Sequence, residues 1–326
     1  MHAIEVKELS KSFTYYEKEV GLKNSVKNLF FRKNLTKEAV KGISLNVEEG
    51  EMVGFLGPNG AGKTTTLKML SGILYPTSGE ASVLGYIPWE RKKEFKRNFS
   101  IVMGQRSQLW WDLPASESLY LNKCIYELDD NSYKEIVDEL TDVLDVRKLL
   151  NIQVRRLSLG ERMKMELIAS LIHKPKMIFL DEPTIGLDII SQRKIREFLK
   201  YYNEQTKATI VLTSHYMADI EDLCKRTVVI NEGKVVYDGM LNAVNDLLDA
   251  KKIIKVKFTS PVDEKDLNEY GIVREFNENE AVLEVDKKDL SSSSSKILDR
   301  LPILDFTAED IPLEQGIEIL YQKKGD

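Results

Sequence analysis

Residues 57–65 constrain this chain more than any other segment does. Their sequence, GPNGAGKTT, fits the pattern G-x-x-x-x-G-K-[ST], and it stands between an apolar run at 51–56 and a helical pattern at 65–70. A buried strand, a glycine-rich turn and a helix in this order bind phosphate, because the backbone N–H groups of the turn and the helix N-terminus point at the anion. The sequence therefore predicts a nucleoside triphosphate site rather than a glycine-rich surface turn.

Every position of this loop is a candidate ligand of the triphosphate. The Lys63 ammonium is expected to bridge the β- and γ-phosphates, and the Thr64 hydroxyl is expected to bind Mg²⁺. The predicted nucleotide-binding residues of the loop are Gly57, Pro58, Asn59, Gly60, Ala61, Gly62, Lys63, Thr64 and Thr65.

Length and composition narrow the class of protein further. The 326 residues suffice for one large domain and a smaller one, and 42% hydrophobic with 30% charged residues is an ordinary globular composition. No apolar run approaches the roughly 20 residues that span a bilayer, and the first residues lack a signal-peptide core, so we expect a cytoplasmic protein. Cys124 and Cys224 lie in unrelated helical patterns, which favours reduced, structural thiols.

The net charge of −5 comes from the C-terminal part of the chain. Residues 1–250 hold equal numbers of basic and acidic side chains, whereas residues 251–326 hold 12 Lys and Arg against 17 Asp and Glu. A nucleic-acid-binding protein is expected to present a basic face. The charge distribution therefore argues against nucleic acid as a main partner.

The middle of the chain alternates between strand and helix patterns. Apolar runs at 99–103, 177–180 and 209–212 predict buried strands, and a helical pattern at 195–202 separates the last two. Buried strands that alternate with helices predict an α/β fold with a mostly parallel sheet. Residues 115–173 show helical periodicity without a strand signal, so we interpret them as an all-helical insertion.

The pattern changes near residue 250 and predicts a small C-terminal α+β domain. The order β-α-β-β-α-β is that of a split βαβ, ferredoxin-like domain, here with one added helix. The five serines at 291–295 are interpreted as a polar linker into the second helix, and a regulatory serine tract is the alternative. Strands are expected at 253–258, 272–276, 281–285 and 303–306, and helices at 264–270, 297–301 and 313–321.

Two carboxylates end the apolar run at 177–180. Asp181 is a candidate for holding Mg²⁺ through water, and Glu182 is a candidate for polarising an attacking water. In-line phosphoryl transfer needs both functions beside the γ-phosphate. Acidic residues at a strand end are common, so this pair gains its meaning from the phosphate-binding loop.

Three further features extend the predicted site. Ser158 caps a helix, and its hydroxyl with the Gly160 N–H forms a second candidate anion site, although a plain capping box is the alternative. Gln105 follows the strand at 99–103, and His215 follows the strand at 209–212. Both side chains are expected at the carboxyl edge of the sheet, where ligands bind in such folds.

As a set, these residues resemble the ATP-binding subunit of an ABC transporter over about residues 1–240. The P-loop NTPase fold of the ABC type adds an antiparallel β subdomain to the parallel core. The family's motifs occur here in the family's order: GPNGAGKTT, Gln105 of the Q-loop, LSLGE at 157–161 as the signature, FLDEP at 179–183, Asp188 of the D-loop and the switch residue His215.

The resemblance implies a head-to-tail dimer, formed by two copies or with a paralogous ATPase subunit, that holds ATP between the phosphate-binding loop of one chain and the signature of the other. It implies that Glu182 is the general base and that His215 senses the γ-phosphate. Ser158 and Gly160 would touch the γ-phosphate of the partner's ATP. By the same resemblance Glu161 and Asp188 join the nucleotide-binding residues, and the Mg²⁺ ligands are Thr64, Gln105 and Asp181.

Two departures from the family pattern bear on this reading. Leu159 and Glu161 replace one Gly and the Gln of the commoner signature LSGGQ, while the phosphate-contacting Ser158 and Gly160 are retained. We expect hydrolysis to survive, with Glu161 a candidate for slowing closure. Phe13 matches the adenine-stacking aromatic by spacing, and Tyr15 and Tyr16 remain alternatives.

The segment at 104–114 and the small C-terminal domain resemble ATPases of type-2 exporters, which pair with separate integral membrane permease subunits. Trp110, Trp111 and Leu113 are then candidates for the socket of the permease, unless the tryptophans pack inside the helical insertion. Residues 17–37 form a basic and apolar insertion of the kind found in polysaccharide-exporting ATPases, expected at a membrane surface or permease. A solvated hairpin arm is its alternative.

The sequence thus predicts an ABC ATPase that hydrolyses ATP to drive export, peripheral on the inner face of the cell membrane. Residues 1–240 are the expected ATP-binding domain and residues 241–326 the second domain. A regulatory ATPase coupled to a membrane sensor, or a non-transport ABC protein acting on ribosomes or DNA, is the alternative function. Copurification of a membrane partner separates these classes.

Overall fold

The computed structural model describes residues 2–16, 34–104, 107–248, 251–311 and 313–322, and the chain divides into two compact units between Asp238 and Gly239. Among the helices described, none combines the length and the apolar character needed to cross a membrane.

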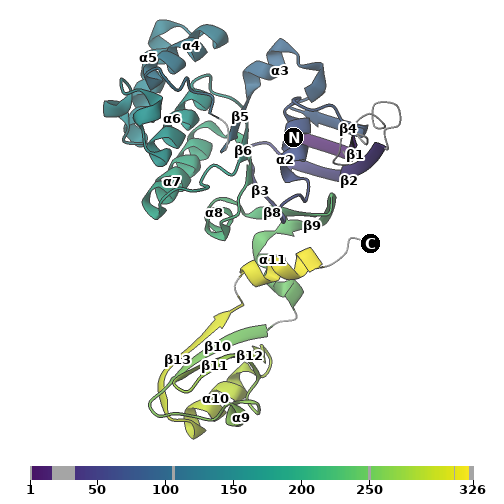
Figure 1. Cartoon of the computed structure of the whole chain (residues 1–326), viewed down its shortest axis with the longest axis vertical. Coiled ribbons are helices and arrows are strands. Elements are labelled where there is room, and N and C mark those ends of the chain that lie inside the picture. The colour runs from purple at the N-terminus through teal and green to yellow at the C-terminus, as the bar shows by residue number, and fades with distance from the viewer. Residues whose placement is uncertain (1, 17–33, 105–106, 249–250, 312, 323–326) are drawn as a thin grey trace, which may run out of the picture. The chain divides into compact units, whose positions relative to one another are not determined.

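A six-stranded sheet forms the centre of the first unit, in the spatial order β5-β6-β7-β3-β8-β9 (Figure 1). Five of its strands, β5 to β8 with β3, run parallel, so their carboxyl ends lie at one edge of the sheet. This confirms the predicted parallel core. The bounds are β3 Met52–Leu56, β5 Phe99–Met103, β6 Met177–Asp181, β7 Thr209–Thr213, β8 Arg226–Asn231 and β9 Lys234–Met240.

A separate antiparallel sheet has the order β2-β1-β4, with bounds β1 His2–Tyr16, β2 Asn34–Glu48 and β4 Ser78–Val83. Its buried residues recur with a period of two, as at Ile43, Leu45 and Val47 of β2. Most of the predicted insertion at 17–37 lies outside the described residues, and residues 34–37 belong to β2.

Helix α2, Lys63–Leu70, contacts strands of both sheets, namely β2, β4 and β6. Leu67 and Leu70 of this helix are buried in the same apolar cluster as Phe55 of β3 and Phe179 of β6. The helix that follows the phosphate-binding loop is therefore fixed by the core of the unit, which also fixes the position of the loop at its N-terminus.

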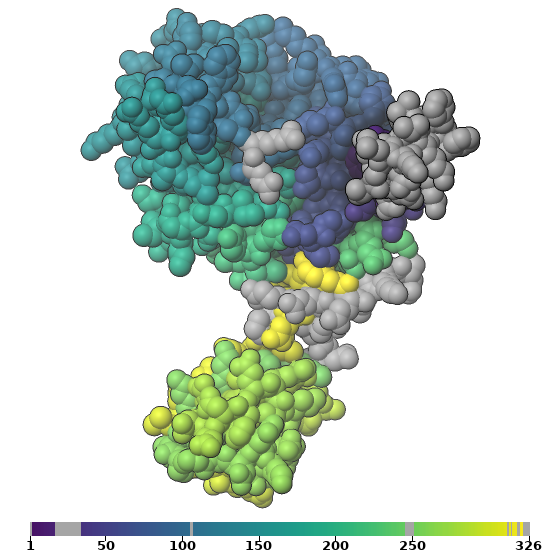
Figure 2. All heavy atoms as spheres, viewed as in Figure 1, coloured from purple at the N-terminus to yellow at the C-terminus, as the bar shows by residue number. Residues whose placement is uncertain are grey.

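The other helices of this unit are α3 Lys93–Asn98, α4 Ala115–Tyr126, α5 Asp130–Val143, α6 Leu159–Leu171, α7 Ile189–Thr206 and α8 Met217–Leu223, with 3-10 turns at Pro88–Glu90, Arg147–Leu149 and Val154–Arg156. Helix α6 is buried along most of its length and contacts α4, α5, α7 and β5. The side chains of α5–α7 (teal) and those of the antiparallel sheet (blue to purple) lie on opposite sides of the unit (Figure 2).

The second unit contains a four-stranded antiparallel sheet in the order β11-β12-β10-β13, which is the predicted split βαβ arrangement. Its core lies between β10 and the helix α10, with Ile254, Val256 and Ile297 among the buried side chains. The elements are a 3-10 segment Leu241–Leu248, β10 Lys251–Phe258, α9 Glu264–Leu267, β11 Ile272–Asn277, β12 Glu280–Asp286, α10 Leu290–Arg300, β13 Ile303–Asp310 and α11 Leu313–Gln322.

The interpretation of residues 291–295 as a linker is wrong, because all five serines lie inside α10. Leu290, Ser293, Ile297 and Leu301 recur every three or four residues and face the core of the domain. Ser293 therefore occupies a buried position of an amphipathic helix, and its polar side chain hid the helical period in the sequence.

Candidate functional site

The phosphate-binding loop turns directly from β3 into α2. Gly62 is the residue that precedes α2, and its φ of 111° is one that residues with a side chain rarely adopt. A Cβ atom at this position would lie 2.6 Å from the carbonyl oxygen of Ala39. A glycine is therefore required where the loop passes the antiparallel sheet and enters the helix.

The loop opens onto a cavity of about 280 Å³. Phe13 of β1 and Glu182 lie on the wall of this cavity together with residues of the loop. Neither Tyr15 nor Tyr16, the rivals of Phe13, is among the described residues that line it. The lining residues are Phe13, Lys37, Ala39, Asn59, Gly60, Ala61, Gly62, Lys63, Thr64, Thr65 and Glu182.

Lys63 is the buried cation of this cavity. Its ammonium donates hydrogen bonds to the carbonyl oxygens of Gly57 and Pro58, the latter at 3.2 Å. Burial lowers the pKa of Lys63, and the nearby carboxylates of Glu182 and Asp181 act in the opposite direction. The backbone of the loop thus holds the side chain of its own lysine.

Thr64 and Asp181 lie side by side at the carboxyl end of β6. The Thr64 hydroxyl is 3.1 and 3.0 Å from the two carboxylate oxygens of Asp181, and the Thr213 hydroxyl donates to Asp181 Oδ1 at 2.8 Å. Thr213 is buried at the end of β7 and had not been singled out in the sequence. Two hydroxyls therefore fix the orientation of the carboxylate.

These oxygen atoms suit Mg²⁺. Among the described residues no group of three or more His, Cys, Asp or Glu side chains could hold a metal ion. Mg²⁺ usually takes only one or two carboxylates and completes its shell with water and phosphate oxygens. Thr64 beside Asp181 fits that requirement, whereas Gln105, the third predicted ligand, lies outside the described residues.

Glu182 and His215 meet across the ends of β6 and β7. Glu182 Oε1 lies 2.8 Å from His215 Nε2. The Glu182 backbone has a φ of 56°, which is uncommon for a residue other than glycine, and its N–H donates to the Thr213 carbonyl and hydroxyl oxygens at 3.1 Å each. The constrained backbone and its hydrogen bonds aim the carboxylate into the cavity.

The second candidate anion site lies at the N-terminus of α6. The Ser158 hydroxyl accepts from the Glu161 N–H at 3.3 Å, and the Glu161 carboxylate accepts from the Ser158 N–H at 2.8 Å. The capping box that was the alternative interpretation is therefore present. None of Ser158, Gly160 and Glu161 is among the described residues that line the phosphate-loop cavity.

Gly160 packs against the start of α7. A Cβ atom at Gly160 would lie 2.4 Å from Ser191 Oγ. Asp188 caps α7 by accepting hydrogen bonds from the Ser191 N–H at 2.9 Å and the Ser191 hydroxyl at 2.6 Å, and the second of these is the main cause that lowers the pKa of Asp188. The signature and the D-loop of one chain therefore form one surface, to which Ser191 contributes.

Three apolar side chains of the segment after β5 are exposed. Trp110 is 57% and Trp111 is 50% exposed, so they do not pack inside the helical segment, and Leu113 is exposed as well. The Arg162 guanidinium lies over the Trp111 ring at 5.1 Å from its centroid. We refer to Trp110, Trp111 and Leu113 as the tryptophan surface.

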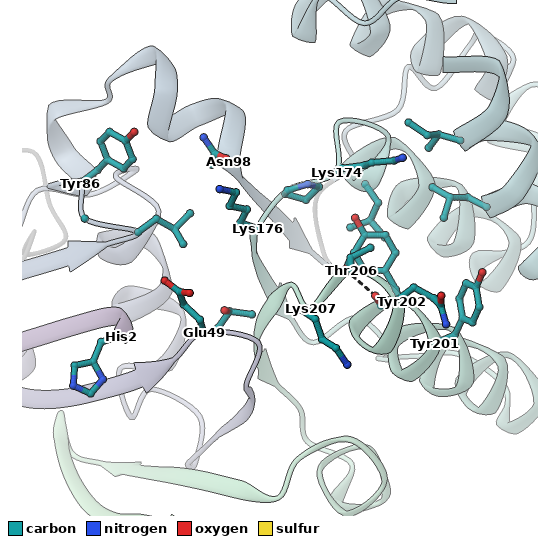
Figure 3. Close-up of a pocket in the computed structure, with 18 of the residues that line it drawn as sticks. His2, Glu49, Tyr86, Asn98, Lys174, Lys176, Tyr201, Tyr202, Thr206 and Lys207 are labelled. Atoms are coloured by element: carbon teal, nitrogen blue, oxygen red, sulfur yellow. Dashed lines mark hydrogen bonds between the residues drawn. The ribbon is translucent and has the colours of Figure 1, made fainter. Parts of the chain in front are cut away.

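A larger cleft of about 980 Å³ lies elsewhere in the first unit (Figure 3). Asn98, Lys176 and Thr209 line it at the starts of β5, β6 and β7, with Tyr202 of α7 in its wall. The phosphate-binding loop follows the carboxyl end of β3, so this cleft lies at the opposite edge of the sheet. It contains none of the predicted site residues.

Comparison with known proteins matches most of the chain to ABC transporters, the family that the sequence motifs resemble. A family profile described as ABC transporter matches residues 40–185, and one described as the C-terminal domain of EvrA-like ABC transporters matches residues 250–309. The chain is 36% identical to the ABC transporter ATP-binding protein NatA of Bacillus subtilis (strain 168), over 64% of this chain and 84% of NatA. It is 34% identical to the linearmycin resistance ATP-binding protein LnrL of the same strain, over 68% of this chain and 70% of LnrL.

Solved structures share the fold. One described as an ATP-binding subunit of an ABC transporter superposes with a TM-score of 0.62 at 24% identity, over 76% of this chain and 93% of the other. Another, the dimeric cassette MJ0796 bound to ADP and Pi, superposes with a TM-score of 0.61 at 22% identity, over 73% of this chain and 98% of the other.

Proposed function

This chain belongs to the family of ABC transporter ATP-binding proteins, and we propose that it works as a head-to-tail dimer that drives export through separate permease subunits. The observation that carries the proposal is the separation of two anion sites. The phosphate-binding loop and Glu182 share one cavity, while Ser158 and Gly160 lie at the N-terminus of α6, outside that cavity. A second copy would complete the site.

In the proposed dimer each chain supplies different groups to one ATP. Phe13 stacks on the adenine, and the loop with Lys63 binds the phosphates. The partner chain adds the Ser158 hydroxyl and the N-terminus of its α6, whose 13 residues give it a helix dipole. Residues 1–240 form the ATP-binding domain in this proposal, and residues 241–326 form the second domain.

Hydrolysis needs a base beside the γ-phosphate. Glu182 takes a proton from water as the water oxygen bonds to phosphorus and the bond to the bridging oxygen breaks, which gives ADP and phosphate. His215 holds the Glu182 carboxylate through the contact of 2.8 Å between its Nε2 and Glu182 Oε1. When bound, Mg²⁺ neutralises charge on the phosphate oxygens, and Thr64 and Asp181 are the described residues that would hold it.

Mixing two inactive variants tests the head-to-tail arrangement. Lys63→Ala disables the loop of its own chain, whereas Ser158→Asp keeps a good helix cap and places negative charge where the partner's γ-phosphate would bind. Each variant alone should be inactive. In a mixed dimer one site combines an intact loop with an intact signature, so an equimolar mixture should recover about a quarter of wild-type activity.

Folded variants that exchange subunits and still show no recovery would contradict the head-to-tail arrangement. Thermal unfolding of both variants supplies the control for folding. Crosslinking of a mixture in which each variant carries a different tag supplies the control for subunit exchange.

The tryptophan surface is the proposed contact with the permease, which would place the chain on the inner face of the cell membrane. Exposed aromatic side chains that lie close together are typical anchors of protein interfaces. The residues at 17–33, which were expected at a membrane surface or permease, lie outside the described part of the chain.

Purification of the tagged chain from detergent-solubilised cells tests this contact. We expect a multi-spanning permease to copurify with the wild type and with a Tyr75→Ala control, which removes another exposed aromatic side chain. The double variant Trp110→Ala/Trp111→Ala should lose it while keeping its ATPase activity. Recovery of a membrane sensor would support the regulatory alternative, and recovery of no membrane protein would contradict the proposal.

A further inference from the structure

Asp219 is a buried carboxylate that contacts three separate segments of the first unit, namely the loops after β6 and β7 and the helix α7. It lies in the short helix α8 and has no exposed surface. Its Oδ2 accepts hydrogen bonds from the Thr184 hydroxyl and, at 2.6 Å, from the Ser214 hydroxyl. Its Oδ1 accepts from Arg196 Nη1 of α7 at 3.0 Å.

The ion pair with Arg196 makes the burial of this charge tolerable. A buried carboxylate is strongly unfavourable unless a cation and hydrogen bonds compensate it. Arg196 is itself largely buried, and it also forms an ion pair with Asp222, which lies in α8 like Asp219 and is partly exposed. Asp219 is thus a fully satisfied acceptor, which indicates a defined position rather than an accidental contact.

The Ser214 contact fixes the backbone around His215. The Ser214 hydroxyl donates to Asp219 and also accepts from the Tyr216 N–H at 3.0 Å. Residues on both sides of His215 are therefore tied through one hydroxyl to the buried carboxylate. This arrangement sets the direction in which the imidazole leaves the end of β7.

The Thr184 contact fixes the backbone after Glu182. Only Pro183 separates the two residues, and its ring restricts the backbone between them. The Thr184 side chain is buried, and the Glu182 backbone is held on its other side by Thr213. The strand end that carries the proposed base is therefore anchored on both sides.

We infer that Asp219 is a positioning residue that holds Glu182 and His215 in the positions they need for ATP hydrolysis. Asp219 is not among the described residues that line the nucleotide cavity, so it acts through Thr184 and Ser214. The inference rests on the proposed roles of Glu182 and His215. A displacement of about 1 Å at reacting groups can cost about a hundredfold in rate, which is why a remote anchor matters.

The test is the substitution Asp219→Asn, which keeps the size of the side chain and removes its charge. We expect kcat to fall about tenfold or more while KM for ATP changes less than about twofold, because the phosphate-binding loop is untouched. Asp222→Asn is the matched control. It removes a carboxylate that pairs with the same Arg196, at 2.7 Å, and should leave kcat within about twofold of the wild type.

Two further variants decide the question if Asp219→Asn does not fold. Thr184→Val and Ser214→Ala each remove one contact and leave the pair of Asp219 with Arg196 in place. Each should lower kcat with little effect on KM, and the double variant should lose less than the product of the two effects, because both act through one carboxylate.

The inference is overturned if a folded Asp219→Asn protein keeps its kcat, if Asp222→Asn loses as much, or if KM rises at constant kcat. It is equally overturned if Thr184→Val and Ser214→Ala both leave kcat unchanged. Glu182→Gln, measured in parallel, separates the two claims. Full turnover in Glu182→Gln contradicts the proposed base itself, whereas loss there with full turnover in Asp219→Asn contradicts only the positioning role.

Discussion

Glu182 Oε1 and His215 Nε2 lie 2.8 Å apart, which joins the carboxyl ends of β6 and β7 by one side-chain contact. The two residues lie 33 positions apart in the sequence, and the register of the two strands pairs Asp181 with Thr213. The parallel pairing therefore brings a carboxylate and an imidazole together. Glu182 directly follows the last paired residue of β6, and His215 comes two positions after the last paired residue of β7. This geometry gives a sharp expectation for each side chain.

Replacement of Glu182 by Gln should nearly abolish turnover and preserve ATP binding. The amide retains the size of the side chain and cannot accept the proton of the attacking water, and general bases contribute about 10² to 10⁴ in rate. Single-turnover hydrolysis and nucleotide binding measured on the same preparation check this expectation. An ATP-dependent dimer should accumulate in light scattering with ATP and not with ADP.

Replacement of Thr213 by Val should raise the Mg²⁺ concentration needed for half-maximal ATPase activity. The variant removes the hydroxyl that donates to Asp181 Oδ1 at 2.8 Å, so the carboxylate loses its fixed orientation. Titration of activity with Mg²⁺ at saturating ATP measures the effect.

Thr227→Val is the matched control for this prediction. Thr227 is equally buried, and its hydroxyl donates to the Gly54 carbonyl oxygen at 3.0 Å. Both variants should cost about 1–2 kcal/mol of stability, and only Thr213→Val should change the Mg²⁺ dependence. An equal shift in both variants would show that the effect is one of stability alone.

The stability of the protein should fall between pH 6.5 and pH 4 through His173. Burial lowers the pKa of His173 to about 4, and its ring stacks on Tyr126 with centroids 3.7 Å apart. Within this pH range the unfolded chain binds a proton that the folded chain does not, so the free energy of unfolding decreases as the pH falls. The loss should reach up to about 3 kcal/mol at pH 4 and grow no further below it.

Denaturant unfolding of wild type and His173→Phe over this pH range provides the check. The phenyl ring keeps the stacking on Tyr126 and cannot titrate. The free energy of unfolding of the wild type minus that of the variant should therefore decrease as the pH falls. A difference that stays constant from pH 7 to pH 4 would exclude His173 as the cause.

The substitution Ser295→Pro should destabilise the second unit by about 3 kcal/mol, because proline in a helix interior removes a hydrogen bond and clashes with the preceding turn. Ser295 is exposed in the middle of α10. Ser295→Ala should instead stabilise the helix by about 0.5 kcal/mol. Calorimetry on the full-length chain measures both, and a linker at 291–295 would tolerate either substitution equally.

The phosphate-binding loop and the strand ends could be predicted because each carries a local signal. Gly62 and Lys63 have fixed positions in a loop pattern, and Asp181 ends a continuous apolar strand. A buried strand followed by a polar residue at its carboxyl end leaves few alternatives in a parallel sheet. That pattern covers the loop residues and Glu182, whereas Lys37 and Ala39 of β2, which also line the cavity, carry no such signal.

Asp219 and Ser293 could not be predicted for the opposite reason. Asp219 stands in a seven-residue helix among other acidic side chains, and its burial depends on Arg196, which is distant in sequence. Ser293 fills a buried helical position with a polar side chain. In both cases tertiary packing determines that the polar side chain is buried, and no periodic pattern in the sequence indicates it.

The loop at residues 57–65 and the N-terminus of α6 belong to one chain and serve different cavities in the proposed dimer. Turnover in dilute solution should therefore depend on the square of the chain concentration, although each chain binds its own ATP at any dilution. Two chains held side by side by permeases in a membrane would escape this dependence. Attachment to permeases in the membrane would then raise the local concentration of the two chains, in addition to coupling them to the path of the cargo.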